Sequence, residues 1–152
     1  MADTDDRTTE PGQDQLQELA IAASNQRARA YTPYSGFDTG AAVLTESGAT
    51  HTGVLVENLI FGLAMCAERV ALFSAVTAGS GRPVALAVAA PSTAGQVTFP
   101  CGPCLQVAIE LGGAEMKIVA TDPENVGNLH VRTIDELAPG IPRRQNPGAG
   151  KL

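Results

Sequence analysis

The chain of 152 residues contains three cysteines, Cys66, Cys101 and Cys104, and they give the clearest indication of chemistry. An odd number of cysteines argues against a framework of disulfides and favours metal binding or catalysis. Taken alone, Cys101-Gly-Pro-Cys104 also suits a redox-active dithiol, and Cys66 suits a buried, inert side chain. Their placement favours a shared site, because Cys66 starts one predicted helix and the C-x-x-C motif opens another.

Thiolates at helix N-termini are stabilised by the helix dipole and by free backbone N–H groups. If the two helices leave adjacent parallel strands, their N-termini meet at the carboxyl edge of the sheet. Three thiolates there supply most of a tetrahedral zinc site, and an open fourth position is typical of catalytic zinc. The two histidines, His51 and His130, lie in strand-like segments, so we expect neither to be the fourth ligand.

Glu68 follows Cys66 by two residues, on the first turn of the same predicted helix. This spacing puts a carboxylate beside the metal without making it a ligand, where it can accept and donate protons. Taken alone, Glu68 would be read as an acid that stabilises a helix N-terminus. Together, Cys66-Ala-Glu68 and Pro100-Cys-Gly-Pro-Cys104 match the pattern of zinc deaminases, a ligand-x-Glu followed by P-C-x-x-C.

Apolar periodicity and turn residues predict the elements that position these side chains. We expect helices from about Leu16 to Arg29, Met65 to Ala78 and Cys101 to Leu111, and strands at Gly40–Thr45, Thr50–Val56, Val84–Ala90, Met116–Ala120 and His130–Thr133. A hairpin followed by alternating helices and strands indicates an α/β fold, a three-layer α/β/α sandwich with a mixed five-stranded sheet.

Composition excludes several classes of protein. The net charge is −6 and no basic stripe is present, so we expect no binding to long nucleic acid or to an anionic membrane surface. No apolar run approaches the ~18 residues of a membrane span, and the acidic N-terminus is unlike a signal peptide, so we expect a cytoplasmic protein. Only 17% of residues are charged and 24 are alanine, which favours an oligomer.

The domain organisation follows from the same pattern. Residues 13–141 form the predicted catalytic domain, whereas the acidic residues 1–12 and the Pro-, Gly- and Arg-rich residues 142–152 are expected to be flexible tails.

Several motifs in order give the chain a wider resemblance. It resembles the small homotetrameric cytidine deaminases, a family with relatives of the blasticidin S deaminase type. The matching stretches are Ala30-Tyr-Thr-Pro-Tyr-Ser-Gly-Phe37, Gly40-Ala-Ala42, Val56-Glu-Asn58, Gly62-Leu63, Cys66-Ala-Glu-Arg69, Pro100-Cys-Gly-Pro-Cys104, Gln106-Val107, and Glu136-Leu137 with Pro139. The resemblance implies the cytidine deaminase fold, a homotetramer, one zinc ion per subunit, and hydrolytic loss of ammonia from a small aminopyrimidine or nucleoside.

The resemblance also implies roles for individual residues. Those around the metal are three zinc ligands, Cys66, Cys101 and Cys104, and a proton shuttle, Glu68. Those around the substrate are a base-pocket side chain, Phe37, a backbone contact to the pyrimidine, Ala67, and a sugar-binding carboxylate, Glu57. Three thiolates on Zn²⁺ leave a net charge of −1, and we expect Arg69 to offset part of it through a hydrogen bond to a thiolate rather than to be a solvated helix arginine.

Three departures from the family concern the substrate. Leu55 stands where the family usually has a ribose-binding Asn, Leu105 stands where it usually has Arg, and no aromatic residue matches the family's C-terminal one near Pro139-Gly-Ile141. The predicted function is zinc-dependent deamination of cytidine or deoxycytidine in pyrimidine salvage. The alternative is deamination of a modified aminopyrimidine, such as a nucleoside antibiotic or a free base, because Leu55 cannot hydrogen-bond a sugar through its side chain.

Two other classes of function are less compatible with these residues. A structural zinc module without catalysis would be expected to lack Glu68 or to have a fourth protein ligand. A thiol redox protein would cycle Cys101 and Cys104 without zinc and would need neither Cys66 nor Glu68.

Overall fold

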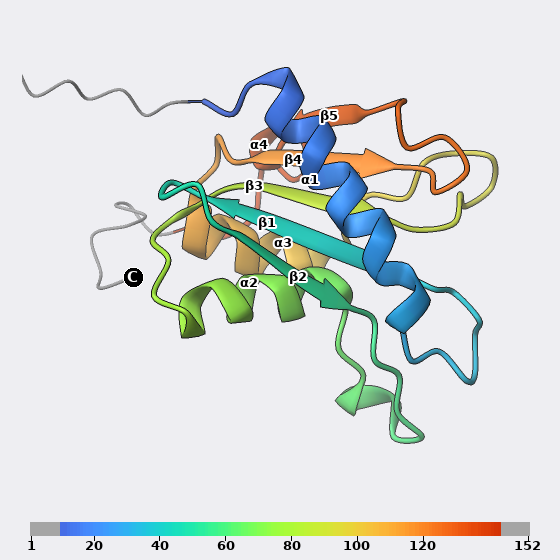
Figure 1. The fold of residues 1–152 in the computed structure, drawn as a ribbon. Helices are drawn as coiled ribbons and strands as arrows, with labels where there is room; N and C mark the ends of the chain where they lie inside the picture. The colour runs from blue at the N-terminus through green and yellow to red at the C-terminus, as the bar shows by residue number, and fades with distance from the viewer. Residues whose placement is uncertain (1–9, 144–152) are drawn as a thin grey trace, which may run out of the picture.

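The computed structural model describes residues 10–143 of the protein. Its elements, in chain order, are α1 (Gln13–Gln26), η1 (Arg27–Arg29), β1 (Gly40–Thr45), β2 (Thr50–Val54), η2 (Phe61–Leu63), α2 (Ala67–Thr77), β3 (Pro83–Ala89), α3 (Gly102–Gly112), β4 (Lys117–Thr121), β5 (His130–Thr133) and α4 (Ile134–Leu137) (Figure 1). All five predicted strands and all three predicted helices are confirmed within a few residues. The short helices η2 and α4 are absent from the predicted set, because so few residues show no apolar periodicity.

The five strands form one mixed sheet in the order β2-β1-β3-β4-β5. β1 is antiparallel to both of its neighbours, β3 and β4 are parallel, and β5 is antiparallel to β4. The expectation that the two cysteine-bearing helices leave adjacent parallel strands is therefore wrong, because β1 lies between β2 and β3. β2 and β3 still run in the same direction, because both are antiparallel to β1, so the segments that follow them emerge at the same edge of the sheet.

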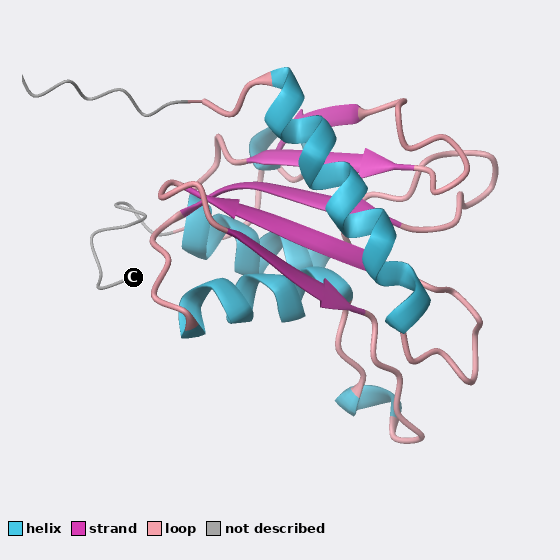
Figure 2. Cartoon of the chain, in the orientation of Figure 1, coloured by secondary structure: helices cyan, strands magenta, loops and turns pink. Residues whose placement is uncertain are grey.

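Helices cover both faces of the sheet (Figure 2). α1 packs on one face, against alternate residues such as Ala42 and Leu44 of β1. α2, α3 and the start of α4 pack on the other face, against Ala41 and Val43 of the same strand. Successive strand side chains point to opposite faces, so a strand that is apolar throughout is buried on both. The predicted three-layer α/β/α sandwich with a mixed five-stranded sheet is confirmed.

Small residues allow the helices to approach the sheet closely. A Cβ atom on Gly53 of β2 would lie 2.4 Å from the carbonyl oxygen of Ala67 and 2.5 Å from the amide nitrogen of Ala71, both in α2. A Cβ atom on Gly40 would lie 2.1 Å from the carbonyl oxygen of Ala23 in α1. Gly53 therefore fixes how closely the first turn of α2, which carries the predicted catalytic residues, packs on the sheet.

The predicted tails, residues 1–12 and 142–152, lie mostly outside the described residues, so the domain limits of 13 and 141 stay predictions. In the described part, Glu10 pairs with Lys117 at 2.7 Å, and Arg143 pairs with Asp135 at 2.8 Å. Among the helices of residues 10–143, none is long and apolar enough to cross a membrane.

Candidate metal centre and substrate site

The three predicted cysteine ligands lie together where α2 and α3 begin. Cys66 and Cys101 are the N-cap residues of these helices, and Cys104 lies in the first turn of α3. The Sγ atoms of Cys66 and Cys101 are 3.9 Å apart, those of Cys101 and Cys104 are 3.3 Å apart, and all three lie within 4.8 Å of one another. No disulfide joins them.

This arrangement fits a zinc ion. Thiolate sulfurs ~2.3 Å from a tetrahedral zinc ion lie about 3.8 Å from one another, close to the separations found here. Within residues 10–143, this is the only group of three or more Cys, His, Asp or Glu side chains with metal-ligand spacing. His51 instead contacts the Ser80 hydroxyl at 2.8 Å, and His130 lies on β5. Three protein ligands leave the fourth position for water, as in catalytic zinc sites.

The surroundings of the thiols favour a thiolate at Cys66. A hydrogen bond with Cys104 and a further one from Arg69 lower the pKa of Cys66 to about 5, against the opposing effect of its burial. The pKa of Cys104 is raised, because it hydrogen-bonds to Cys66 and is buried. Zinc binds the deprotonated form of cysteine, so the site is prepared for a metal ion at Cys66.

Glu68 is the second residue of α2 and is only 5% exposed. Burial raises the pKa of Glu68 to about 7, and the nearby Cys66 charge adds to this effect, whereas the backbone N–H of Glu68 and the charge of Arg69 oppose it. A carboxyl group with a pKa near neutrality can both accept and donate a proton at working pH. The structure thus places the predicted proton shuttle beside the predicted metal ligands, in a suitable environment.

Arg69 lies against the sulfur cluster. Its Nη2 donates to the Sγ atom of Cys66 at 3.5 Å, and this bond, with one to Cys104, raises the pKa of the guanidinium. The Nε atom of Arg69 is buried and has no hydrogen-bond partner among the described residues. This placement is the one expected of a group that offsets thiolate charge, and not that of a solvated helix arginine.

The predicted substrate residues lie on the segments that join this edge of the sheet. Ala67 is fully buried as the first residue of α2. Phe37, in the loop before β1, packs against the apolar cluster of Val88, Ala90 and Ala120. Because β1 is antiparallel to β2 and β3, the loop that enters β1 lies at the same edge as the segments that leave those two strands.

Leu55 and Glu57 lie on the extended segment that follows β2. The N–H of Tyr31 donates to the Leu55 carbonyl at 2.9 Å, and the N–H of Glu57 donates to the Tyr31 carbonyl at 2.8 Å. Val56 pairs with Tyr31 on one side and with Met65 on the other as isolated β-bridges. Alternation along an extended chain puts the side chains of Leu55 and Glu57 on one side, with Val56 on the other.

The residues that hold the Glu57 carboxylate are not among the predicted site residues. Its oxygens accept hydrogen bonds from the backbone N–H groups of Tyr34 and Ser35 and from the Ser35 hydroxyl. The hydrogen bond from the Ser35 hydroxyl, together with the two backbone bonds, lowers the pKa of Glu57 against the smaller effect of burial. A serine just before a glycine is a common turn signal, and it could have indicated that the Ser35 side chain bonds the local backbone.

The other departures from the family fall in packed positions. Leu105 is buried in the core between the sheet and α3, so it fills space where a charged side chain would need a partner. Ile141 packs against the same core. These residues account for apolar packing, and nothing in the structure gives them a role with substrate.

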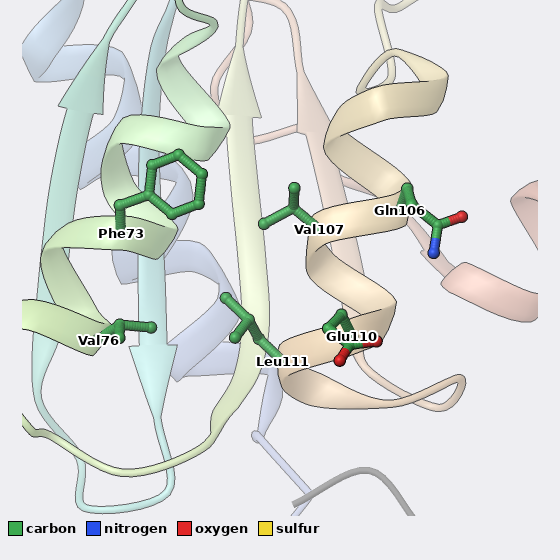
Figure 3. Close-up of a pocket in the computed structure, with 6 residues that line it drawn as sticks. All are labelled: Phe73, Val76, Gln106, Val107, Glu110 and Leu111. Carbon is green, nitrogen blue, oxygen red and sulfur yellow. The ribbon is translucent and has the colours of Figure 1, made fainter. Parts of the chain in front are cut away.

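Two apolar surfaces are prominent among residues 10–143. One is a groove between α2 and α3, in which Phe73 and Val76 face Val107 and Leu111, with Gln106 and Glu110 also in its lining (Figure 3). The other is the loop around η2, which projects away from the sheet (Figure 1). In that loop Leu59 is 78% exposed and Phe61 81% exposed, and Ile60 and Leu63 are exposed as well.

Comparisons with known proteins show what this chain is similar to. The family model of the cytidine and deoxycytidylate deaminase zinc-binding region matches residues 13–120. The chain is 40% identical over 124 residues to the cytidine deaminase of Halalkalibacterium halodurans, and the match covers 82% of this chain and 91% of that protein. It is 42% identical over 108 residues to the cytidine deaminase of Mycobacterium tuberculosis, and this match covers 70% of this chain and 80% of that protein. The crystal structure of cytidine deaminase from Burkholderia pseudomallei superimposes with a TM-score of 0.74 at 41% identity, over 81% of this chain and 95% of that one.

Proposed function

The chain belongs to the cytidine and deoxycytidylate deaminase family. We propose that it removes the amino group of cytidine or deoxycytidine by hydrolysis and gives uridine or deoxyuridine and ammonia. The observation that carries this proposal is a buried carboxyl group, Glu68, two residues from one of three clustered cysteines. The relatives are named cytidine deaminases, so they favour this substrate over the alternative of a modified aminopyrimidine.

In this proposal Cys66, Cys101 and Cys104 hold one zinc ion per subunit. The chemistry that bound zinc supplies is Lewis acidity, which lowers the pKa of a water molecule in its open position. Three thiolates on a divalent ion weaken this effect, because they leave a net charge of −1. The hydrogen bond from Arg69 to Cys66 withdraws part of the negative charge and so restores some of the acidity.

Glu68 moves the protons. It accepts one proton from the attacking water and donates it to the ring nitrogen beside the carbon that bears the amino group. After the new C–O bond forms, Glu68 transfers the hydroxyl proton to the amino group, which leaves as ammonia when the C–N bond breaks. The pKa of Glu68, raised by burial to about 7, suits a group that must take up and release a proton in turn.

The remaining site residues hold the substrate. Phe37 packs against the base, the backbone at Ala67 contacts the pyrimidine, and Glu57 accepts a hydrogen bond from a sugar hydroxyl. Leu55 lies beside Glu57 and offers only apolar contact to the sugar. The reaction belongs to pyrimidine salvage, and we place the protein in the cytoplasm, as the sequence predicts.

We also propose that the protein is a homotetramer. The apolar groove between α2 and α3 and the loop around η2 are two distinct exposed apolar surfaces. A closed tetramer with two-fold symmetry needs at least two different self-complementary surfaces, so a second and a third copy of the chain are the occupants that fit. Light scattering should report the mass of four chains, and a stable, active monomer would contradict the proposal.

The deamination itself is tested by ammonia release from a panel of aminopyrimidines. The purified zinc-loaded protein should act on cytidine and deoxycytidine, and removal of zinc by a chelator should abolish turnover. Preferential release of ammonia from a modified nucleoside or a free base would support the alternative substrate class. A folded, zinc-loaded protein that releases ammonia from none of them would refute the proposal.

A further inference from the structure

The loop before β1 is tied to the segment after β2 through one carboxylate. Oε2 of Glu57 accepts hydrogen bonds from the N–H groups of Tyr34 at 3.0 Å and Ser35 at 3.3 Å, and Oε1 accepts one from the Ser35 hydroxyl. A carboxylate has about four acceptor positions, so the loop occupies three of them and leaves one on Oε1. One sugar hydroxyl can therefore bind Glu57 while all three loop bonds remain in place.

Ser35 also bonds in the other direction along the chain. Its Oγ atom accepts a hydrogen bond from the backbone N–H of Phe37 at 3.0 Å while its hydroxyl proton goes to Glu57. Gly36, between the two residues, has a φ of +65°, which L side chains rarely adopt. The chain therefore turns sharply at Gly36, and the Ser35 hydroxyl holds the two sides of this turn together.

The position of this turn determines where the Phe37 ring lies. Phe37 is half-buried against the cluster of Val88, Ala90 and Ala120, at the carboxyl ends of β3 and β4. The far side of the loop is held independently, since Thr32 donates to the Asp38 carboxylate and Thr39 donates to the Phe37 carbonyl at 3.1 Å. The side-chain link from Phe37 to Glu57 runs through Oγ of Ser35, which bonds both residues, while the backbone N–H groups of Tyr34 and Ser35 hold only the near side of the turn to Glu57.

We infer that Ser35 is a positioning residue that couples the base-pocket ring of Phe37 to the sugar-binding carboxylate of Glu57. This inference rests on the proposed function, in which these two residues hold opposite ends of the nucleoside. With the hydroxyl present, the two ends of the site have a fixed separation before substrate arrives, so less ordering is needed on binding. Without the hydroxyl, Glu57 loses its bond at Oε1 and the Phe37 amide loses its acceptor. Ser35 therefore affects the affinity for nucleoside and leaves the chemical step at α2 and α3 unchanged.

The kinetic test is Ser35→Ala in the zinc-loaded protein. We expect the KM for cytidine to rise up to about tenfold, because the loop must then be ordered when the nucleoside binds, while kcat stays within about twofold. Ser35→Thr keeps a hydroxyl at the same atom and should restore most of the affinity. The matched control is Ser47→Ala, which removes an exposed serine hydroxyl bonded to the Ser80 carbonyl at the opposite end of β1 and should leave KM unchanged.

A second measurement does not depend on activity. The chain has no tryptophan and two tyrosines, Tyr31 and Tyr34, and both lie in this loop, so the intrinsic fluorescence of the protein reports on it. Time-resolved anisotropy should show faster local motion of tyrosine in Ser35→Ala than in the wild type, Ser35→Thr or Ser47→Ala. Thermal unfolding and zinc content should be unchanged in all four proteins, since Ser35 is exposed and remote from the core.

The outcomes separate this inference from the proposed function. If the wild type does not deaminate cytidine, the proposed function fails, and the anisotropy still shows whether Ser35 orders the loop. If the wild type is active, an unchanged KM in Ser35→Ala overturns the inference. A fall in kcat at constant KM, or a rise in KM that Ser35→Thr does not reverse, overturns it too.

Discussion

The metal end and the sugar end of the site are built in different ways. At the metal end, Cys104 is fully buried and Glu68 is 5% exposed, and both are fixed on the first turns of helices packed on the sheet. At the sugar end, Glu57 and Ser35 lie on connecting segments, and hydrogen bonds to a carboxylate hold them rather than apolar burial.

This difference assigns different tasks to the two ends. In the proposed mechanism, bond-making chemistry needs Glu68 and the three cysteines in fixed positions, and helix N-termini packed on the sheet provide them. Recognition of a flexible nucleoside is placed on loops, which tolerate substitution with little loss of stability. Loss of a metal ligand or of the packing of α2 should therefore affect stability and rate together. A change of Glu68 that keeps its shape should affect the rate alone, and changes at the sugar end should affect affinity alone.

The largest effect is expected for Cys104→Ser. Metal binding is coupled to folding, so loss of the buried ligand should remove zinc and activity and lower the thermal stability. Metal analysis and thermal unfolding measure both effects. Cys101→Ser, at an exposed position of the same cluster, should also lose zinc but should unfold at a higher temperature than Cys104→Ser. A Cys104→Ser protein with a full complement of zinc would show that the cluster is not the metal site.

Glu68→Gln should separate rate from metal binding at the same end. The amide cannot shuttle protons but has nearly the same shape, so zinc content and fold should be retained. General acid–base catalysis typically contributes about 10²–10⁴-fold, and kcat should fall by at least this much because one group serves several transfers. Single-turnover kinetics with metal analysis on the same sample measure this. Near-normal turnover in the variant would assign the proton transfers to another group.

Gly53→Ala tests whether the metal end depends on close packing between α2 and β2. The added methyl group would meet backbone atoms of Ala67 and Ala71, so it must push α2 away from the sheet. Overpacking of this kind costs about 1–3 kcal/mol, and kcat should fall as well because Glu68 moves with the helix. Denaturant unfolding and steady-state kinetics measure the two effects.

The control for this substitution is Gly127→Ala, in the loop between β4 and β5. A Cβ atom there meets nothing within 4 Å, so stability and kcat should both be unchanged. Equal stability of Gly53→Ala and the wild type would mean that the position of α2 does not depend on this contact.

The same difference explains which parts of the molecule could be predicted from the sequence. The strands and the three longer helices were predictable because burial imposes an apolar pattern, which is periodic in the amphipathic helices and continuous in β3. The clustering of the three cysteines beside Glu68 was predictable because the deaminase pattern fixes residue type and spacing within one helix turn. The strand order could not be predicted. Whether β1 lies between β2 and β3 or at the edge of the sheet depends on long-range pairing that no local sequence pattern records.

The loop contacts were equally hard to predict. Glu57 and Phe37 could be proposed as substrate contacts through the family resemblance, but the link between them depends on a serine hydroxyl and on backbone N–H groups. Backbone donors have no residue type, so they leave no trace in a sequence. The isolated pairing of Val56 with Tyr31 and Met65 likewise depends on how two loops approach each other.

The smallest effect is expected for Leu55→Asn, at the sugar end. Leu55 is half-buried on the same side of the extended segment as Glu57, and its backbone N–H and carbonyl are already bonded to Thr39 and Tyr31. An Asn at this position would therefore change only the side chain and leave the path of the segment intact. A new hydrogen bond to a sugar hydroxyl contributes about 0.5–1.5 kcal/mol, so kcat/KM for cytidine should rise about two- to tenfold, mostly through KM.

The comparison that makes this result specific is a substrate without the sugar, such as 1-methylcytosine. Its kcat/KM should not rise in Leu55→Asn, because it has no hydroxyl to accept or donate a bond. If Leu55 merely fills the core, the polar side chain should lower thermal stability and leave the preference for cytidine unchanged. Such a result would remove Leu55 from the proposed specificity determinants and leave Glu57 as the proposed sugar contact on this segment. A gain confined to cytidine would instead show that affinity at the sugar end can be altered by one side chain without any change at the metal end.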